Sequence, residues 1–460
     1  MGMDLKTEKD WPASWKTLEH GIRSGRYTDP EFARLEFEKL WSKAWQMAAR
    51  LDEVPEPGDY TVYEIGDESV IVVRVDEHTV KAFNNACPHR GTALAQDCGT
   101  FEGERIICPF HGWRWGTDGM VQYVLERKEF HNGNLSDSDV SLRKINLKIY
   151  AGFVFINFDK NPCSFDEFIA PVRQLIDDLV ISDMHHIWWK SVVAPANWKV
   201  AVEAFLEGYH VPATHPQLET TSAAFIYGDD VSGEPPEYSH ADHIYESFPK
   251  GHGRFLGGQK TPMAGHTLLA GDPVDIMADR LNLLVEGMDA MIMKEDVDLV
   301  RSLKGKPIPE GSTLGGEYVQ ALYSTAAAQE RPMPKPAREI MDQWGGEIFV
   351  FPNLLILPQA GNAMMYRMRP NGDDPNSCIF EIYSTKTRPA AEAIPRAVVE
   401  KMTDASDPAQ FLKIPRQDFS NIPRIQKGLR TGGMKQIWLA SYFEQMILNM
   451  HQEMDRYLQS

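Results

Sequence analysis

The 460-residue chain lacks the features of several large protein classes. It contains no uninterrupted apolar run of the ~18 residues that a membrane-spanning helix requires. Its first residues, MGMDLKTEKDWPASW, are polar and do not form the apolar segment of a signal peptide. These absences predict a soluble, cytoplasmic protein that has no membrane partner.

Cysteine and positive charge are also scarce. Five cysteines are an odd and sparse set for a disulfide framework, and they favour a reducing compartment. The formal net charge of -18 argues against nucleic-acid binding, which normally requires a basic face. A composition of 43% hydrophobic and 24% charged residues is that of an ordinary globular protein.

The spacing of apolar residues changes along the chain. Residues 30–50 have helical spacing, whereas residues 45–160 contain short β-branched runs between polar turns and predict a small all-β domain. From Pro162 onward, helical stretches mixed with strands predict an α+β region. Residues 275–293 and 434–458 are predicted amphipathic helices, and the methionines of the first would form core or pocket wall.

Two short segments carry a matching pair of metal-binding side chains. Cys87-Pro-His89 and Cys108-Pro-Phe-His111 are separated by 18 residues, enough for a hairpin that brings the pairs together. Two thiolates on one iron and two imidazoles on the other form the Rieske [2Fe–2S] arrangement, whose potential exceeds that of an all-cysteine cluster. A Cys2His2 zinc site is the alternative, but zinc fingers have a different ligand spacing.

A second set of candidate ligands occurs in the segment ANWKVAVEAFLEGYHVPATHP. Glu203, Glu207 and His210 are expected on one face of a helix, which Pro212 interrupts before His215. Two histidines five positions apart, with one carboxylate from elsewhere, would form a facial triad for Fe(II). That geometry leaves coordination positions open for oxygen.

Both sets resemble those of the Rieske non-heme iron oxygenases, the ring-hydroxylating oxygenase α-subunit family. The resemblance rests on CPHRG, CPFHGW and NWK-x3-E-x3-EGYH-x4-H, and it extends over most of the chain. It implies that His210 and His215 bind the mononuclear iron. The family places an Asp before a Gln-x-Gly-Leu stretch, so QDFSNIPRIQKGL nominates Asp418, with Asp404 and Asp407 as poorer candidates.

The resemblance also implies roles for residues near these ligands. Glu207 would connect His210 to His111 in the Rieske domain of a neighbouring subunit. Respiratory Rieske proteins have an additional cysteine in each cluster loop, and Phe110 takes that place in the second loop. No disulfide between the cluster loops is therefore expected, and Cys98 is expected to be a free thiol that is not a cluster ligand.

Three parts of the chain follow from the same resemblance. Residues 1–44 are expected to be an N-terminal helical segment that packs on the catalytic domain. Residues 45–160 would form the Rieske [2Fe–2S] domain. Residues 161–460 would form a helix-grip catalytic domain, an antiparallel sheet with helices, carrying a long insert at 216–345.

The implied activity is that of a terminal oxygenase component. A reductase, with or without a ferredoxin, would supply electrons from NAD(P)H, and the chain would form a head-to-tail homotrimer with or without a β-subunit. The main expectation is O2-dependent hydroxylation of an aromatic or bulky apolar ring, as in aromatic hydrocarbon catabolism. A Rieske monooxygenase performing O- or N-demethylation or alicyclic hydroxylation is the alternative. A pure electron carrier, without mononuclear iron, is the third hypothesis.

Overall fold

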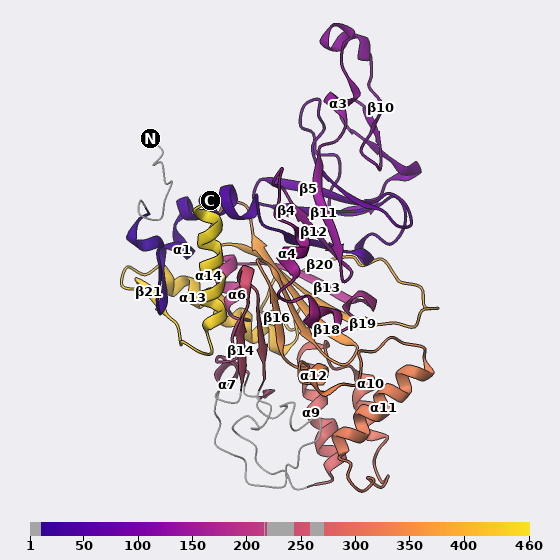
Figure 1. Ribbon diagram of the computed structural model, residues 1–460, viewed down its shortest axis with the longest axis vertical. Coiled ribbons are helices and arrows are strands. Elements are labelled where there is room, and N and C mark those ends of the chain that lie inside the picture. The colour runs from indigo at the N-terminus through magenta and orange to yellow at the C-terminus, as the bar shows by residue number, and fades with distance from the viewer. Residues whose placement is uncertain (1–10, 216, 219–242, 258–270) are drawn as a thin grey trace.

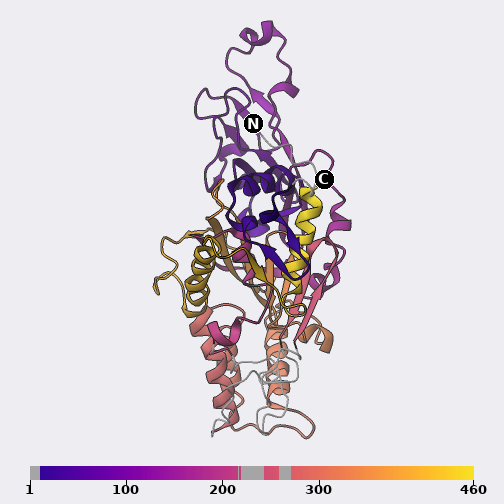
Figure 2. The same ribbon diagram turned by 90° about the vertical axis from the view of Figure 1, so that its left-hand side faces the viewer.

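The computed structural model describes residues 11–215, 217–218, 243–257 and 271–460. Parts of the predicted insert at 216–345 therefore lie outside the described residues. Two β-rich units are stacked along the long axis of the molecule (Figures 1 and 2). Within the described ranges, no helix is both long enough and apolar enough to cross a membrane.

The first unit is built on a seven-stranded sheet, with a smaller sheet beyond it. The seven strands lie in the order β3 (Gln46–Arg50), β12 (Phe153–Asn157), β11 (Lys144–Tyr150), β6 (Val80–Asn84), β5 (Glu68–Arg74), β4 (Asp59–Ile65) and β7 (Cys98–Thr100). The smaller sheet has the order β10 (Val121–Tyr123), β9 (Arg114–Gly116) and β8 (Arg105–Ile107). All pairings in these two sheets are antiparallel. Strand β4 alternates buried and more exposed positions, and the last five residues of β5 are buried, as the β-branched runs predict.

The second unit is built on an eight-stranded sheet. Its order is β14 (Ile244–Ser247), β15 (Gly253–Leu256), β16 (Glu347–Val350), β17 (Leu354–Pro358), β18 (Asn362–Pro370), β19 (Cys378–Thr387), β13 (Met184–Ala194) and β20 (Glu400–Lys401). Every residue of β18 is buried, because both faces of the sheet are covered. All pairings in this sheet are antiparallel except that of the short edge strand β20 with β13, so the predicted antiparallel sheet with helices is observed apart from this edge.

Most helices surround this sheet or extend beyond it, whereas α3 (Asp137–Val140) belongs to the first unit. Their bounds are α1 (Gly25–Thr28), α2 (Pro30–Glu36), α3 (Asp137–Val140), α4 (Phe165–Ile169), α5 (Arg173–Asp177), α6 (Trp198–Glu203), α7 (Val211–Thr214), α9 (Pro273–Met288), α10 (Lys294–Arg301), α11 (Leu314–Ala328), α12 (Arg338–Met341), α13 (Lys413–Leu429) and α14 (Gln445–Leu458). Short helical turns lie at η2 (Ala13–Trp15), η3 (Phe37–Trp41), η4 (Leu51–Glu53), η5 (Glu102–Glu104), η6 (Arg127–Gly133), η7 (Ile181–Asp183) and η10 (Pro249–Gly251). Figure 1 shows α9, α10 and α11 at the end of the molecule opposite β10.

The two β units share a continuous interior. The Asn353 side chain accepts a hydrogen bond from the Met47 N–H (3.0 Å) and donates one to the Met47 carbonyl (3.1 Å). Arg367 donates two hydrogen bonds to the buried Glu381 carboxylate and a third to the Ala48 carbonyl. These paired polar groups fix the first unit on β17, β18 and β19, because leaving any of them unpaired in the interior would cost free energy.

The N-terminal segment packs on the second unit beside the C-terminal helix. Lys199 of α6 forms a fully buried ion pair with Glu36 of α2 (2.7 Å). Arg26 donates a hydrogen bond to Asp455 of α14 (2.5 Å). Figure 1 shows α1 and α14 side by side, and a small sheet of β1 (Thr17–Leu18), β2 (Gly21–Arg23) and β21 (Gln436–Trp438) lies next to them.

Two of the predicted helices are shorter in the structure. Residues 30–50 begin as α2, but residues 46–50 form β3, because their five buried side chains pair with β12 and enter the core. Residues 434–458 begin as β21, and α14 starts only at Gln445. Trp438 is 76% exposed rather than on the apolar face of a helix. Tertiary pairing overrides helical spacing in both places.

One buried histidine makes the stability of this fold depend on pH. The His252 Nε2–H donates to the Phe168 carbonyl (2.7 Å), and Nδ1 accepts the Phe351 N–H (3.1 Å). Burial lowers the pKa of His252 to about 4, below the value of ~6.5 in an unfolded chain. The unfolded state therefore binds more protons than the folded state between these two values. The contribution of His252 to the free energy of unfolding is therefore fully present above pH ~6.5 and is lost as the pH falls toward 4.

We expect His252→Gln to flatten this dependence, because glutamine offers the same donor and acceptor but does not titrate. Between about pH 7.5 and about pH 5, the wild type should lose roughly 2 kcal/mol more unfolding free energy than the variant. Urea unfolding at the two pH values measures the difference, and the exposed His78→Gln is the control. Equal pH slopes for wild type and His252→Gln would contradict the prediction.

Candidate metal centres

The two predicted cluster loops have the same backbone structure. The Cys87 N–H donates to the Thr92 carbonyl (2.9 Å), as the Cys108 N–H donates to the Trp113 carbonyl (2.9 Å). In each loop the glycine four positions after the cysteine donates back to the cysteine carbonyl, at 2.8 and 3.0 Å. Both glycines have positive φ, which favours glycine at this point of the turn.

These loops bring two thiols and two imidazoles together. The Nδ1 atoms of His89 and His111 lie 3.2 Å apart, and Trp113 stacks on the His89 ring at 4.8 Å. Cys87 and Cys108 are both buried. Burial raises the pKa of the Cys108 thiol, but hydrogen bonds from the backbone N–H groups of His111 and Phe110 and from the side chains of Cys87 and Thr92 together lower that pKa. Two sulfur and two nitrogen donors in adjacent loops fit a Rieske-type [2Fe–2S] cluster.

The remaining thiols lie outside this arrangement. Cys98 belongs to β7, and all five cysteines are free. Phe110, at the tip of the second loop, is 58% exposed. The second loop therefore offers no thiol at position 110, and Cys98 lies in β7 outside the cluster loops.

Three residues predicted as iron ligands meet in the second unit. His210 and His215 flank the short helix α7, and Asp418 lies on α13. One donor atom from each lies within 4.8 Å of the others. The His215 Nε2 is 2.8 Å from the Asp418 Oδ1, and the His210 Nε2 is 3.9 Å from it. Two imidazoles and one carboxylate on one side of a cavity fit a mononuclear Fe(II) site with open positions.

A second polar group orients each histidine. The Glu207 carboxylate accepts from His210 Nδ1 (2.9 Å) and from the His210 backbone N–H (2.9 Å). His215 Nδ1 lies 3.0 Å from the Gln417 Oε1, and Gln217 also contacts Gln417. Both Nε2 atoms are thereby turned toward Asp418. Partners of this kind fix the tautomer and the ring orientation of a metal-binding histidine.

The backbone around Glu207 differs from the prediction. Helix α6 ends at Glu203, so Glu203, Glu207 and His210 do not share a helical face. Glu207 lies in the turn before α7, where Gly208 packs so closely on Phe255 that an added Cβ would lie 2.7 Å from that ring. Pro212 occupies the first turn of α7 rather than breaking a helix.

Glu203 belongs to a buried network away from the metal site. Its carboxylate accepts from the Tyr27 hydroxyl (2.9 Å) and lies 2.7 Å from the His451 Nε2. Burial, against the hydrogen bond from Tyr27, raises the pKa of Glu203 to about 8. The residue therefore joins α6 to α1 and α14.

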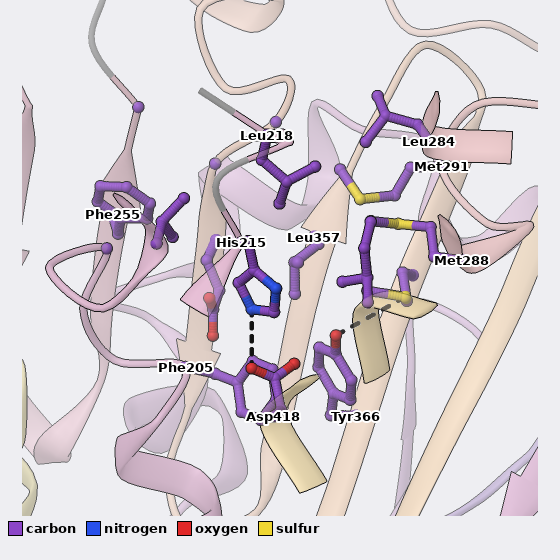
Figure 3. A pocket seen from close by; sticks show the side chains of 18 of the residues that line it. Phe205, His215, Leu218, Phe255, Leu284, Met288, Met291, Leu357, Tyr366 and Asp418 are labelled. Atoms are coloured by element: carbon purple, nitrogen blue, oxygen red, sulfur yellow. Dashed lines mark hydrogen bonds and ion pairs between the residues drawn. The ribbon is translucent and has the colours of Figure 1, made fainter. Parts of the chain in front are cut away.

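A cavity of ≈ 190 Å³ opens beside the three candidate ligands. Figure 3 shows His215 and Asp418 facing each other in it, with the aromatic rings of Phe205 and Tyr366 beside Asp418. Most of the lining is apolar or aromatic: Phe205, Val211, Leu218, Phe255, Leu284, Met288, Met291, Trp344, Leu357, Met364, Tyr366 and Ile414. Met288 and Met291 of the predicted methionine-rich helix thus reach the pocket wall.

Sequence reasoning missed two polar residues of this site. Gln417 could have been identified from the sequence, since it directly precedes the nominated ligand Asp418. Glu347, at the start of β16, had none, because the segment EIFVFPNLLILP indicates only a strand. Burial, reinforced by Glu207 and Asp418, raises the pKa of Glu347 well above its ordinary value.

We expect Gln417→Leu to weaken binding of the mononuclear metal by roughly 10- to 100-fold, because His215 loses the acceptor that orients it. Metal titration of the apoprotein measures the affinity, and the absorbance of the [2Fe–2S] cluster should not change. Gln174→Leu, on the exposed side of α5, is the matched control. Unchanged metal affinity in Gln417→Leu would remove the orienting role.

Other histidines that the sequence offers lie elsewhere. His186 Nδ1 is 2.6 Å from the buried Asp52 carboxylate, between the two β units. His243 is buried and packs on Phe255. His240 lies outside the described residues.

Two family models match the chain. The model described as "Rieske [2Fe-2S] domain" covers residues 44–136. The model described as "Ring hydroxylating alpha subunit (catalytic domain)" covers residues 181–268 and 308–460. The first contains all four candidate cluster ligands, and the second contains His210, His215 and Asp418.

Curated relatives match over part of their length. The glycine betaine monooxygenase oxygenase subunit of Chromohalobacter salexigens is 29% identical over 47% of this chain and 48% of its own length. The carnitine monooxygenase oxygenase subunit of Escherichia coli K12 is 32% identical over 48% and 59%. The methanesulfonate monooxygenase hydroxylase subunit alpha of Methylosulfonomonas methylovora is 30% identical over 45% and 53%. The matches thus span about half of each relative.

Solved structures share the fold. The quaternary ammonium Rieske monooxygenase CntA, in complex with L-carnitine, has a TM-score of 0.61 at 17% identity and covers 95% of both chains. Naphthalene 1,2-dioxygenase with indole bound has a TM-score of 0.65 at 17% identity, covering 96% of this chain and 92% of that one. Identities this low establish a common fold only.

Proposed function

This chain belongs to the ring-hydroxylating oxygenase α-subunit family, with a Rieske [2Fe–2S] domain ahead of the catalytic domain, and from that premise we propose that it is the terminal component of a monooxygenase. The proposed reaction adds one oxygen atom to a carbon bound to nitrogen in a small N-methylated substrate. The observation that carries the proposal is the set of His210, His215 and Asp418 facing one apolar cavity.

The chain's own residues would prepare the site in three ways. Cys87, His89, Cys108 and His111 would hold the cluster, and the triad would hold the mononuclear iron. When bound, these groups supply one-electron transfer and dioxygen activation. Glu207 and Gln417 hold the two imidazole rings in position, and the apolar wall excludes water from the reacting carbon.

The names of the sequence relatives support a monooxygenase, the alternative in the sequence analysis. Two of the three are named for glycine betaine and carnitine and the third for methanesulfonate, and each is called a monooxygenase. None is named for an aromatic hydrocarbon, so these relatives give the main expectation of an aromatic ring substrate no support. The electron-carrier hypothesis accounts for neither the triad nor the cavity.

The reaction balances with an external reductant. Dioxygen, two electrons and two protons convert an N–CH3 group to N–CH2OH and one water. The carbon–nitrogen bond of the hydroxymethyl product then breaks, which gives the demethylated amine and formaldehyde. The electrons would come from a reduced nicotinamide through a flavin- or iron–sulfur-containing reductase, which is the proposed protein partner.

Electron delivery between subunits fits the shape of the chain. Figures 1 and 2 place β10, next to the second cluster loop, at one end of the molecule and α7 far from it. Direct transfer within one chain would have to cross most of that length. We therefore include a head-to-tail trimer in the proposal, in which the cluster of one subunit serves the triad of the next through Glu207.

A single-turnover experiment tests the proposed function. The iron-loaded protein is chemically reduced and mixed with ¹⁸O2 and a panel of N-methylated amines, methoxyarenes and polycyclic arenes. Cluster reoxidation is followed by absorbance, and products are identified by mass spectrometry. Faster reoxidation with an N-methylated compound, with formaldehyde carrying one ¹⁸O atom before exchange with water, would support the proposal. A diol carrying two ¹⁸O atoms would replace it with a dioxygenase.

A further inference from the structure

A buried carboxyl group in the cavity wall has no role in the site described so far. Glu347 is only 6% exposed, and its Oε1 has no hydrogen-bond partner among the described residues. Its backbone is engaged in the pairing of β16 with β15, opposite Phe255. The backbone thus holds the residue in place while the side chain remains available to a ligand.

The same residue lines the cavity together with the triad. Glu347 and the candidate ligands His210, His215 and Asp418 belong to one lining. Because burial of a charged group without a partner costs several kcal/mol, Glu347 favours its neutral form when no cation is near and its carboxylate form when a cation lies beside it. Within the described part of the lining the acidic residues are Glu207, Glu347 and Asp418, and neither Lys nor Arg is present. The protein side chains described there supply no cation for Glu347.

The surrounding wall is suited to a methylated cation. Phe205, Phe255, Trp344 and Tyr366 contribute aromatic rings to the lining. Figure 3 shows three of these rings around the His215–Asp418 pair. Aromatic faces attract a quaternary ammonium through their quadrupoles, and they bury its methyl groups at the same time. One carboxylate combined with such rings selects a positive charge that carries apolar substituents.

We propose that Glu347 is the specificity-determining residue that binds the cationic nitrogen of the substrate, which is an N-methylated ammonium compound. This inference rests on the proposed function, because it places the charged nitrogen next to the carbon that is oxidised. Glu207 is engaged with His210, and Asp418 faces the two histidines. Of the acidic residues described in the lining, Glu347 is the one without a partner of its own.

Binding of two isosteric probes tests the inference without turnover. Choline and 3,3-dimethylbutan-1-ol have the same shape, but only choline carries a positive nitrogen. Isothermal titration calorimetry with the iron-loaded, oxidised trimeric holoenzyme should give choline at least ~10-fold tighter binding than the neutral probe. Equal affinity of the wild type for both probes would overturn the inference, and this arm requires no variant.

A charge-neutral variant tests the residue. Glu347→Gln keeps the shape and can still donate a hydrogen bond, so it should abolish the preference for choline while the neutral probe binds as before. Glu347→Met should do the same, whereas the exposed Glu339→Gln should retain the preference. A cation preference that survives in Glu347→Gln would overturn the assignment. If Glu347 is instead protonated and donates a hydrogen bond to a neutral ligand, Glu347→Gln should bind the probes with wild-type affinity. Only Glu347→Met should then bind them more weakly.

The proposed function can fail separately from the inference. If choline binding depends on Glu347 but single turnover with ¹⁸O2 gives no oxygenated product from any N-methylated compound, the proposed reaction is wrong and the cation site stands. If an N-methylated compound is oxidised equally fast by wild type and Glu347→Gln, the reaction stands and the role of Glu347 is wrong.

Discussion

Replacement of Asp418 by alanine is expected to remove the mononuclear iron and leave the [2Fe–2S] cluster intact. Asp418 contributes the only carboxylate of the described three-residue set and lies 2.8 Å from the His215 Nε2. Loss of a residue that only orients a metal ligand costs about 10- to 100-fold. Loss of the ligand itself should therefore lower coupled turnover by more than ~100-fold. Iron analysis should give two irons per chain instead of three.

The control for this variant is Asp404→Ala. Asp404 was a poorer candidate in the sequence, and in the structure it is exposed and binds the Ser406 hydroxyl and N–H. That variant should keep three irons and normal turnover. The cluster absorbance should be unchanged in both variants, since the loops that carry Cys87 and Cys108 belong to the two sheets of the first unit, whereas Asp418 and Asp404 belong to the second unit. Three irons in Asp418→Ala would move the third ligand to another residue.

Glu207→Gln is expected to retain all three irons but to lower coupled turnover by about 100-fold. The carboxylate of Glu207 holds the imidazole and the backbone N–H of His210 at the same time. It is mostly buried but lies two positions before the exposed Tyr209. Glutamine keeps the size of the side chain, loses its charge and can accept only one of the two hydrogen bonds. Electron transfer through Glu207 in the proposed trimer should therefore be slowed.

Two measurements separate an electron bridge from a purely structural role. In a single turnover, the Glu207→Gln cluster should reoxidise slowly even with substrate bound, although iron content and substrate affinity remain normal. Gln417→Leu, which affects the other histidine, should instead show weakened metal affinity and, once saturated with iron, near-normal reoxidation. Reoxidation of Glu207→Gln at the wild-type rate would remove Glu207 from the electron path. Loss of iron in that variant would reduce its role to holding His210.

Local spacing was sufficient for the parts of the site that lie close together in the chain. Cys87 and His89 belong to one tight turn, and Cys108 and His111 belong to another. Within the described residues between the two turns, the predicted hairpin is not observed, because β7 pairs with β4 and β8 pairs with β9. A turn of this kind follows from its own backbone hydrogen bonds and its glycine. His210 and His215 are likewise brought together by local structure, because they cap the two ends of the single short helix α7. Spacings of two, three and five residues therefore predicted these parts of both candidate centres.

Site residues that are far apart in the chain meet only in the assembled sheet and helices. Asp418 was found by family resemblance and is 203 positions from His215 in the chain. Gln417 reaches His215 only because α13 packs against the segment that carries α7. Glu347 is an ordinary strand residue until β16 pairs with β15 and turns its carboxyl group into the cavity wall. Its environment is a property of long-range packing, which single-sequence periodicity does not encode.

The sequence and its family resemblance thus predicted the two sets of candidate metal ligands, the all-β unit around the first and the mixed unit around the second. The tertiary structure decided where α6 ends, why residues 46–50 and 436–438 are strands, and which side chains line the cavity. The physical reason is the range of the interactions. Turn hydrogen bonds and ligand spacing act within a few residues, whereas strand pairing, core burial and an unpaired buried carboxylate arise only between segments that folding brings together.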